Sequence, residues 1–562
     1  MPSAAVPRLH RLLPIISWLP KCSGDTLRAD FVAGLALGAL LIPEAMAYAG
    51  IAGLAPQAGL FAAAFGLFTY ALFGSSRHLA VAATSGSAAM LAALVAPLAQ
   101  GDAARYAMLA SATAVAAGVL LWLGYFFKLG FVSEFIAKPV LKGFVFGIAV
   151  TIIVKQAPKL LGIHHGSGSF FEQLWNLLTS LTHFNPWTLA VGVSALVITF
   201  GLGAVAPRVP SALVVFIGGI VASKYLGLEQ HGVEVVGLIQ GGVPHFTLPA
   251  IGPDAWPDVF AGAVGIVLIM YAEALAAGRT FGAKFKYDVD ANQELAALAT
   301  ANLASGFFQG FVVGGGMSGT AANASGGART QLSTIITSVL TLITVAYLTP
   351  LFRDLPEAVL GAIVIHAVAH LADVAELRRF ARLRTGAIYS ALTALAGVLA
   401  LGILKGLLLA ICLTLVALMK KLTSPQESML GRIPGTQTFA DIKRYPEAQP
   451  IPGLLIYRPN GVVFFANVNR IMANLRQAIA QAPAPLRAVI LNLEAVSETD
   501  VTSLDLLEQL RADLQESGVR LVLARVTDPV LEFLARSGFT ARLGEENIRH
   551  HVASAVDSCA VS

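Results

Sequence analysis

Cysteines and charged residues are scarce in this chain of 562 residues. The three cysteines, Cys22, Cys412 and Cys559, are too far apart in sequence to indicate a metal centre or a disulfide framework. Charged residues form 13% of the chain, against about 25% in soluble proteins. The net charge is only +5, and lysine and arginine gather in short loops, so we expect no nucleic-acid partner.

A cleavable signal and the motifs of enzymes are also lacking. The first apolar run is short and no small-residue cleavage site follows it, so we expect no removable signal peptide. The C-terminal part has no phosphate-binding loop, dinucleotide fingerprint, nucleophile elbow or cluster of metal ligands. We therefore expect neither enzymatic activity nor a bound cofactor or metal.

Apolar residues, by contrast, form 56% of the chain and gather in long runs. A helix that spans a bilayer needs about 20 apolar residues, so we predict a polytopic α-helical membrane protein in contact with the lipid bilayer. Several segments, notably the third, tenth, thirteenth and fourteenth, are too short to cross fully. The fourteen predicted spans are 31–52, 59–74, 84–99, 106–127, 137–157, 187–205, 211–226, 256–278, 292–310, 317–328, 331–350, 357–371, 384–399 and 402–420.

Lysine and arginine are distributed unevenly between the loops, and cytoplasmic loops normally carry the excess. With a cytoplasmic N-terminus, the even-numbered loops are cytoplasmic, and Lys155 and Lys159 are exceptions in an odd-numbered loop. We expect a multi-pass protein of the inner or plasma membrane with both termini in the cytoplasm. The basic residues of the even-numbered loops are Arg77, Lys128, Lys138, Arg208, Arg279, Lys284, Lys286 and those of 377–384.

Two short segments rich in small residues occupy matching positions in the two halves of the membrane part. They are HLAVAATSGSAAML (78–91) and GFVVGGGMSGTAAN (310–323), each the third segment of a half with seven spans. Such interrupted segments indicate an inverted-repeat transporter, because an odd number of spans reverses the orientation of the second half. The alternative is a pair of packing helices whose small residues allow close approach.

These segments have the features of an anion site. If residues 79–83 and 311–315 are extended, the helices that follow begin near Thr84 and Met317, at a common point within the membrane. The first N–H groups of a helix lack partners and, with the helix dipole, attract anions. The glycines at 314–316 would let a ligand approach the backbone. Hydroxyl groups could add donors at Thr84, Ser85, Ser87, Ser318 and Thr320.

Two acidic residues lie within apolar spans, Glu44 in the first and Glu273 in the eighth. A carboxyl group inside the membrane is costly and indicates function, and burial favours its protonated form, so either could carry a proton. The alternative is a carboxyl that braces a broken helix. Tyr48 lies one turn after Glu44, as a cavity wall or as a packing residue. Four other polar residues are expected to cap, brace or pack: Asn292, Glu294, Asn323 and His366.

The C-terminal residues alternate between strand-like and helix-like patterns, which indicates a small α/β domain. Two strand-like runs flank a PNG turn within 453–468, and further strands are expected at 488–496 and 519–526. Helices are expected at 467–481, 503–518 and 529–538. The predicted divisions of the whole chain are a cytoplasmic segment (1–28), a membrane domain (29–425), a linker (426–452) and a cytoplasmic α/β domain (453–555).

Several long stretches are similar to one protein family, the SulP sulfate permeases, equivalent to the solute carrier family 26 anion transporters. The C-terminal stretch resembles the sulfate-transporter and anti-sigma-factor-antagonist (STAS) domain. The similarity runs from about residue 28 to 550. The stretches that carry it are ADFVAGLALGALLIPEAMAYAGIAGLAPQAGLFAA (29–63), FGSSRHLAVAATSG (73–86), DANQELAALATANLASGFFQGFVVGGGMSGTAANASGGARTQL (290–332), LPEAVLGAIVIHA (355–367) and AVILNLEAVSETDVTSLDLLEQL (488–510).

This resemblance implies a seven-plus-seven inverted repeat like that of the uracil permease fold. It implies a core of spans 1–4 and 8–11, a gate of spans 5–7 and 12–14, and a homodimer. It places a small anion between the third and tenth spans. Family site positions correspond to Glu44, Tyr48, Thr84, Ser85, Glu273 and Ser318. Their neighbours Met317, Gly319 and Thr320, at the start of the tenth span, complete our predicted substrate site.

The sequence departs from the family pattern at three places. Ala82 and Ala83 replace a common Gly-Pro, and Gly319 replaces an arginine, so the predicted site lacks a fixed positive charge. Ala277 lacks the hydroxyl typical of sodium-coupled members, which favours coupling to protons through Glu44 and Glu273. Thr502 is at the position that anti-sigma antagonists phosphorylate, and we expect it to cap a helix instead.

Three functions follow as hypotheses. The first is a proton-coupled symporter or exchanger of a small anion (sulfate, bicarbonate, chloride or a dicarboxylate), in which an elevator-like motion moves the core against the gate. The second is a passive anion channel of the same fold. The third is a membrane sensor with the C-terminal domain as its output.

Overall fold

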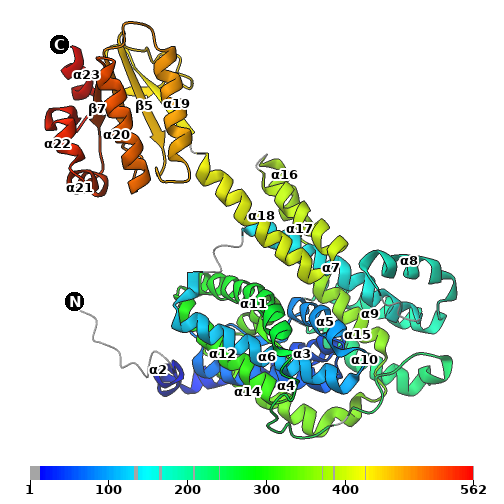
Figure 1. Cartoon of the computed structure of the whole chain (residues 1–562). Coiled ribbons are helices and arrows are strands. Elements are labelled where there is room, and N and C mark those ends of the chain that lie inside the picture. The colour runs from blue at the N-terminus through cyan, green and yellow to red at the C-terminus, as the bar shows by residue number, and fades with distance from the viewer. Residues whose placement is uncertain are drawn as a thin grey trace. The chain divides into compact units, whose positions relative to one another are not determined.

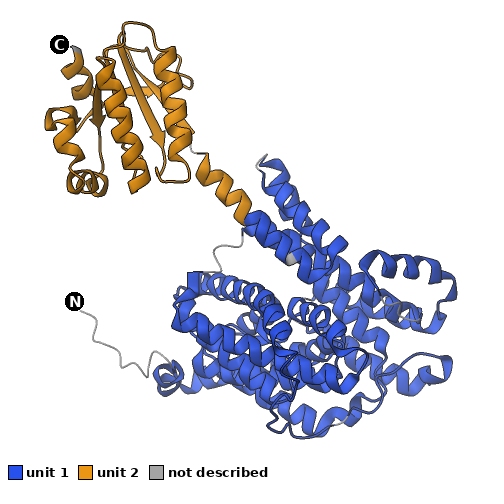
Figure 2. Ribbon diagram, viewed as in Figure 1, with its two compact units in different colours: residues 1–414 blue, residues 415–562 orange. Residues whose placement is uncertain are grey.

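The computed structural model describes residues 13–131, 137–163, 168–206, 209–239, 241–369, 371–383, 386–424 and 426–560. The chain divides into two compact units, residues 1–414 and 415–562, which Figure 2 colours separately. The first unit is helical apart from a short pair of strands in its described part, and the second is built around a six-stranded sheet.

A helix lies at each of the fourteen positions predicted as spans. Among the described residues, nine helical stretches are long and apolar enough to cross a membrane, so the chain has the helices of a polytopic membrane protein. The number of actual crossings stays a prediction. The fourteen helices are α3 (Gly24–Ile51), α4 (Pro56–Phe73), α5 (Ser85–Ala99), α6 (Ala103–Phe126), α7 (Lys138–Leu161), α9 (Pro186–Val205), α10 (Ser211–Leu226), α11 (Trp256–Phe285), α12 (Ala291–Phe307), α13 (Met317–Ser325), α14 (Leu332–Ile343), α15 (Glu357–Ala369), α17 (Ala387–Leu401) and α18 (Ile403–Thr423).

In the first unit, helices formed in two predicted loops between spans, and one span helix begins earlier than predicted. Helices α8 (Phe170–Ser180) and α16 (Val374–Arg382) lie in predicted loops. Helix α3 begins at Gly24 rather than near residue 31, because the Ser23 hydroxyl accepts a hydrogen bond from the N–H of Thr26. The predicted N-terminal segment therefore ends in helix.

The helices of the first unit pack in two groups, which can be followed in Figure 1. In one group α12 packs on α4 and α6, α14 packs on α3 and α4, and α11 and α13 join them. In the other, α7 packs on α9, α15 and α17, and α10 packs on α9. The groups meet where α3 contacts α10 and α15, and where α5 contacts α7.

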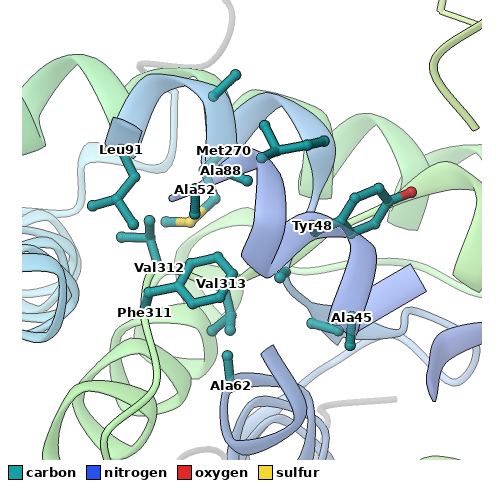
Figure 3. Close-up of a cluster of buried hydrophobic side chains, with 14 of the residues drawn as sticks. Ala45, Tyr48, Ala52, Ala62, Ala88, Leu91, Met270, Phe311, Val312 and Val313 are labelled. Atoms are coloured by element: carbon teal, nitrogen blue, oxygen red, sulfur yellow. The ribbon is translucent and has the colours of Figure 1, made fainter. Parts of the chain in front are cut away.

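An apolar cluster fixes the extended residues that precede α13. Phe311, Val312 and Val313 are fully buried, and Figure 3 shows them beside Leu91 of α5. In that view the hydroxyl of Tyr48 points away from the cluster. Because extended backbone at this depth needs protein rather than lipid around it, the cluster gives these residues a fixed position.

The second unit contains a mostly parallel sheet with the strand order β4-β3-β5-β6-β7-β8. Alternate residues of β6 face opposite sides: Val489 and Leu491 join one apolar cluster, and Ala488 and Ile490 join another. The strands are β3 (Gln426–Arg432), β4 (Phe439–Asp441), β5 (Leu454–Asn460), β6 (Ala488–Asn492), β7 (Arg520–Ala524) and β8 (Ile548–Arg549), and the helices are α19 (Val468–Gln481), α20 (Val501–Glu516), α21 (Asp528–Arg536), α22 (Phe539–Leu543) and α23 (Val552–Ala560).

Two expectations for this unit are wrong. The stretch 426–452 is not a linker, because it contains β3 and β4, and β3 pairs antiparallel with β5. The second strand expected around the PNG turn does not form. Residues 461–467 fold into turns instead, in which the Asn467 side chain donates to the carbonyl of Val462 and accepts from the N–H of Phe464.

Candidate functional site

Two short strands hold the two predicted helix starts together. β1 (Val81–Ala82) pairs antiparallel with β2 (Gly314–Gly315), with Val81 opposite Gly315 and Ala82 opposite Gly314. Helix α5 begins three residues after β1 and α13 two residues after β2. The sequence prediction of two extended segments followed by helices is therefore confirmed, and the β1–β2 ladder brings the helix starts side by side.

The glycines of β2 have a packing role besides the one expected. A Cβ atom on Gly314 would lie 2.4 Å from Cγ of Met270, and one on Gly315 would lie 2.9 Å from Cβ of Ala274. Both neighbours belong to α11, so these glycines let α11 pack directly on the ladder. They also line the cavity described below, which leaves their backbone within reach of a ligand.

Each helix start offers N–H groups that have no acceptor within the helix. In α5 the Thr84 hydroxyl accepts from the N–H of Ser87, which leaves the N–H groups of Ser85 and Gly86. In α13 Gly316 gives no side-chain cap, and the three N–H groups of residues 317–319 precede the first helical bond. The positive ends of two helix dipoles thus lie at one place.

A cavity of about 540 Å³ opens in front of these helix starts. Met317 and Ser318 are exposed to it, whereas Gly319 is buried in its wall. The opposite wall comes from the other helix group, through α7, α10 and α15. Predicted site residues that line the cavity are Glu44, Tyr48, Thr84, Ser85, Glu273, Met317, Ser318 and Gly319.

Thr320 is placed differently from our expectation. Its side chain is fully buried and is not among the cavity-lining residues. Its hydroxyl donates to the carbonyl of Gly316 at 2.6 Å and accepts from the N–H of Ala80 at 3.3 Å. Thr320 therefore ties α13 to the residue before β1 and braces the site instead of donating to a ligand.

The two acidic residues of the cavity lie on different helices of one group. Glu44 on α3 is 5% exposed and lies one turn before Tyr48. Glu273 on α11 faces the start of α5: its two carboxyl oxygens lie 3.6 and 3.8 Å from the Cβ position of Gly86. A charged Glu273 would compete with an anion for this positive helix end, whereas a protonated one would not.

The sequence prediction missed a positive charge in the cavity wall. Lys142 of α7 lines the cavity, and its Nζ lies 3.1 Å from Oδ2 of Asp373, with both side chains about one-third exposed. The cavity wall therefore contains a cation, paired with Asp373, that the expectation of a site without a fixed positive charge did not include. In the sequence Lys142 follows Lys138 near the predicted cytoplasmic end of a span, where it is typical of a topological charge.

Other polar residues brace the fold as expected. Asn292 donates to the carbonyl of Tyr125, Glu294 accepts from the Tyr70 hydroxyl, and Asn323 donates to the carbonyl of His78. His366 packs edge-on against Phe200 and also lines the cavity, a position that the expectation of simple packing missed. Within the described ranges, no group of His, Cys, Asp and Glu residues could hold a metal ion.

Comparison with known proteins places the chain in a family. Residues 27–394 match the model of the sulfate permease family, and residues 445–555 match that of the STAS domain. A probable sulfate transporter of Mycobacterium tuberculosis is 35% identical over 532 residues, which cover 95% of each chain. Sulfate transporter 1.3 of Arabidopsis thaliana is 30% identical and covers 98% of this chain and 88% of the plant protein.

Solved structures share the fold at lower identity. The murine solute carrier 26 family member A9, an anion transporter solved in the inward-facing state, has a TM-score of 0.92 at 21% identity, covering 100% of this chain and 96% of that one. The transmembrane domain of a cyanobacterial bicarbonate transporter has a TM-score of 0.61 at 22% identity, covering 70% and 98%.

The fold and the family match define a membrane transporter of anions with a C-terminal STAS domain, and not an enzyme. The chain belongs to the sulfate permease family, equivalent to solute carrier family 26.

Proposed function

We propose that this protein is a secondary active transporter of a small inorganic or organic anion, such as sulfate, bicarbonate or a dicarboxylate, coupled to protons. The observation that carries the proposal is the meeting of two helix starts at one cavity that also contains Glu44 and Glu273. The N–H groups bind the anion, and Lys142 adds attraction from the opposite wall.

Proton coupling follows from the charges in the cavity. An anion next to a charged Glu273 or Glu44 is repelled, so protonation of these carboxyl groups favours anion binding. A proton that enters with the anion then leaves with it. Ala277, one turn after Glu273, offers no hydroxyl for a sodium ion, which supports protons as the coupling ion.

Transport proceeds by an elevator-like motion of one helix group against the other. The group with α3–α6 and α11–α14 acts as the core, and α7, α9, α10, α15, α17 and α18 act as the gate. We propose that all fourteen helices span, as two inverted halves of seven. The antiparallel ladder, with one strand from each half, supports this symmetry. The protein forms a homodimer in the inner or plasma membrane, with both termini in the cytoplasm.

Uptake by proteoliposomes tests the proposal. Purified protein is offered sulfate, bicarbonate, chloride or fumarate, with and without an inward proton gradient. Accumulation of one anion above its equilibrium level, lost when the gradient is collapsed, is the expected result. Uptake that only equilibrates indicates a passive channel, and uptake that needs a trapped internal anion indicates an exchanger. No flux of any anion would favour the sensor hypothesis.

A further inference from the structure

A second cavity, of about 250 Å³, shares walls from α3, α5 and α7 with the first but lies further along these helices. On α7, Leu141, Lys142 and Val145 face the first cavity, and Thr151 begins the wall of the second. At 1.5 Å per residue, Val145 and Thr151 are about 9 Å apart along the helix axis. The two cavities therefore follow one another along α7.

On two helices of the other group, residues that line the first cavity are likewise followed by residues that line the second. On α5, Ser85 lines the first cavity and Ala89, one turn later, lines the second. On α3, Tyr48 lines the first cavity, and Gly50 and Ile51 line the second. The second cavity thus lies between the two helix groups, beyond the layer that holds the helix starts.

The second cavity carries a positive charge that no acidic residue balances. Two lysines line it, and Lys159 is paired with Glu357, with Nζ 2.8 Å from Oε2. Lys155 is partly buried and has no ion-pair partner in the part of the chain that the structure describes. A partly buried ammonium without a partner is less favourable than one in water, so an anion in this cavity would stabilise it. The other polar lining residues include the amides of Gln156, Gln173 and Asn176.

Helix α8 forms the outer wall of this cavity. Gln173, Asn176 and Leu177 line the cavity, at the spacing that places residues on one helix face. On the remaining surface, Phe171 and Trp175 are 57% and 67% exposed. Helix α8 is therefore amphipathic, with an apolar surface left toward its surroundings and a mostly polar surface over the cavity.

We propose that this second cavity is a binding site for a small inorganic oxyanion, with Lys155 as its cationic ligand and α8 as its wall. The physiological meaning of this site rests on the proposed function. During transport the anion would occupy the second cavity on the extracytoplasmic side, before or after it occupies the first. The proposal also gives a reason for the two exceptions to the loop charge pattern, because Lys155 serves binding and Lys159 pairs with Glu357, rather than either orienting the membrane spans.

Thiol labelling tests the site without any transport. An Asn176→Cys variant in nanodiscs is reacted with an anionic methanethiosulfonate reagent and with a cationic one. Peptide mass spectrometry separates residue 176 from the native cysteines. We expect sulfate to slow the anionic reagent at residue 176 by about fivefold, compared with gluconate at the same ionic strength. An equal rate in both salts overturns the proposal, whatever the behaviour of other variants.

Variants of Lys155 then assign the charge. In the Asn176→Cys background, Lys155→Gln should remove sulfate protection and slow the anionic reagent by about fivefold, without slowing the cationic one. Lys155→Arg should retain protection. Lys224→Gln, which removes an exposed lysine of α10 outside this cavity, is the matched control and should change neither rate. Unchanged protection in Lys155→Gln would overturn the role of this lysine.

The outcomes separate this site from the proposed function. A protein that moves no anion but shows sulfate protection at residue 176 retains the second site and loses the proposed transport. A protein that accumulates sulfate but shows no protection retains the transport proposal and loses the second site.

Discussion

Glu44 is the residue whose charge most directly tests proton coupling. We predict that Glu44→Gln, which keeps the shape and removes the titratable proton, abolishes accumulation driven by a pH gradient. Exchange at equilibrium should persist, because the helix starts proposed to bind the anion are unchanged. Uptake at a series of pH gradients measures this. Glu229→Gln, in an exposed turn, is the control. Concentrative uptake that keeps its pH dependence in Glu44→Gln would contradict the role.

Gly319 offers a second test of the site at the residue scale. A Cβ atom there would lie 3.3 Å from a methyl group of Leu41 and 3.4 Å from Cβ of Ala80, so these neighbours must shift slightly; because Gly319 lines the cavity, we expect a longer side chain to extend into it. A charge pair at about 4 Å gives roughly 4 kcal/mol at an effective dielectric of about 20, and desolvation of the cation offsets much of it. We predict that Gly319→Arg tightens the apparent affinity for a dianion about tenfold and slows turnover.

Uptake kinetics across external pH measure both effects. Dependence on pH should weaken in Gly319→Arg. The new positive charge partly offsets the negative charge of Glu44 or Glu273, which protonation otherwise has to remove before the anion binds. Gly319→Gln, which is uncharged, is the matched control for bulk. If a folded Gly319→Arg protein binds the anion no more tightly than Gly319→Gln, residue 319 does not face the anion.

The sequence indicated individual candidate site residues only where the motif itself carried the chemistry. Glu44 and Glu273 stand out because a carboxyl group within an apolar run is costly to bury and therefore indicates a site. The role of Thr320 could not be assigned from the sequence. Whether its hydroxyl donates to a ligand or to the carbonyl of Gly316 depends on the three-dimensional packing of the helix start. Lys142 was missed because its role depends on the packing of one helix group against the other.

At the scale of elements, the β1–β2 ladder predicts different effects for two neighbouring glycines. A Cβ atom on Gly315 would lie 2.8 Å from Cδ1 of Leu79, 2.9 Å from Cβ and 3.0 Å from Cα of Ala274, so Gly315→Ala must displace Leu79 and push α11 away from the ladder. On Gly316 the nearest atom would be Cγ2 of Thr84 at 3.5 Å, an ordinary contact. We predict a loss of about 1–3 kcal/mol in stability for Gly315→Ala and little change for Gly316→Ala.

Thermal unfolding and substrate binding of the two purified variants check this prediction. Both variants add one methyl group to adjacent residues, so each controls for the other. Equal melting temperatures and equal affinities would show that α11 does not press on the ladder.

The start of α20 gives a pH-dependent prediction outside the membrane. Asp500 caps this helix in place of Thr502, which is exposed in the first turn, so the expected cap at Thr502 is wrong. Burial alone would raise the pKa of Asp500, but hydrogen bonds from Ser503 and from the N–H of Phe465 outweigh it and lower the pKa. A lowered pKa stabilises the fold above the ordinary value of about 3.9 and ceases to do so as pH falls through the lower value.

We predict that Asp500→Ala destabilises the C-terminal domain by about 1 kcal/mol at pH 7. The difference from the unmodified domain should shrink as the pH falls below about 4. Urea unfolding at pH 7 and pH 3 measures both. Asp505→Ala, at an exposed position of the same helix, is the control and should change little. A difference that is the same at both pH values would contradict the role of the charge.

Elements were predictable where their pattern was local. The β1–β2 segments were found because small residues interrupt an apolar run, a signal within a few positions. The pairing of β3 with β5 was missed. The sequence suggests that β5 forms a hairpin with the apolar run after its PNG turn, whereas its antiparallel partner is β3, which comes earlier in the chain. Helix α8 was missed because its eleven residues are amphipathic and too short for a span.

At the scale of the whole molecule, the two units should separate. The STAS sheet begins with β3 at Gln426, so a cut after residue 424 spares it, whereas a cut near 440 would leave β3 without its partner β5. We predict that residues 1–424 insert into the membrane and transport more slowly, because membrane helices satisfy their own hydrogen bonds. Residues 426–562 should unfold cooperatively on their own, because two apolar clusters close within them.

Uptake by the shortened chain and denaturant unfolding of the separate domain measure these outcomes. A chain cut after residue 440 is the matched comparison and should be recovered in lower yield. Failure of residues 1–424 to insert would show that the C-terminal unit takes part in folding of the membrane unit.

The β1–β2 ladder also bears on how such a chain could arise. Strand β1 and the start of α5 come from residues before 100. Strand β2 and the start of α13 come from residues after 310. If the two halves are the inverted repeats proposed above, neither half alone could form the ladder, and a half-length ancestor would have needed a second copy in the opposite orientation to build it. On that premise, gene fusion would have joined two chains that already depended on each other, and each half would then have been free to acquire different residues around a shared centre.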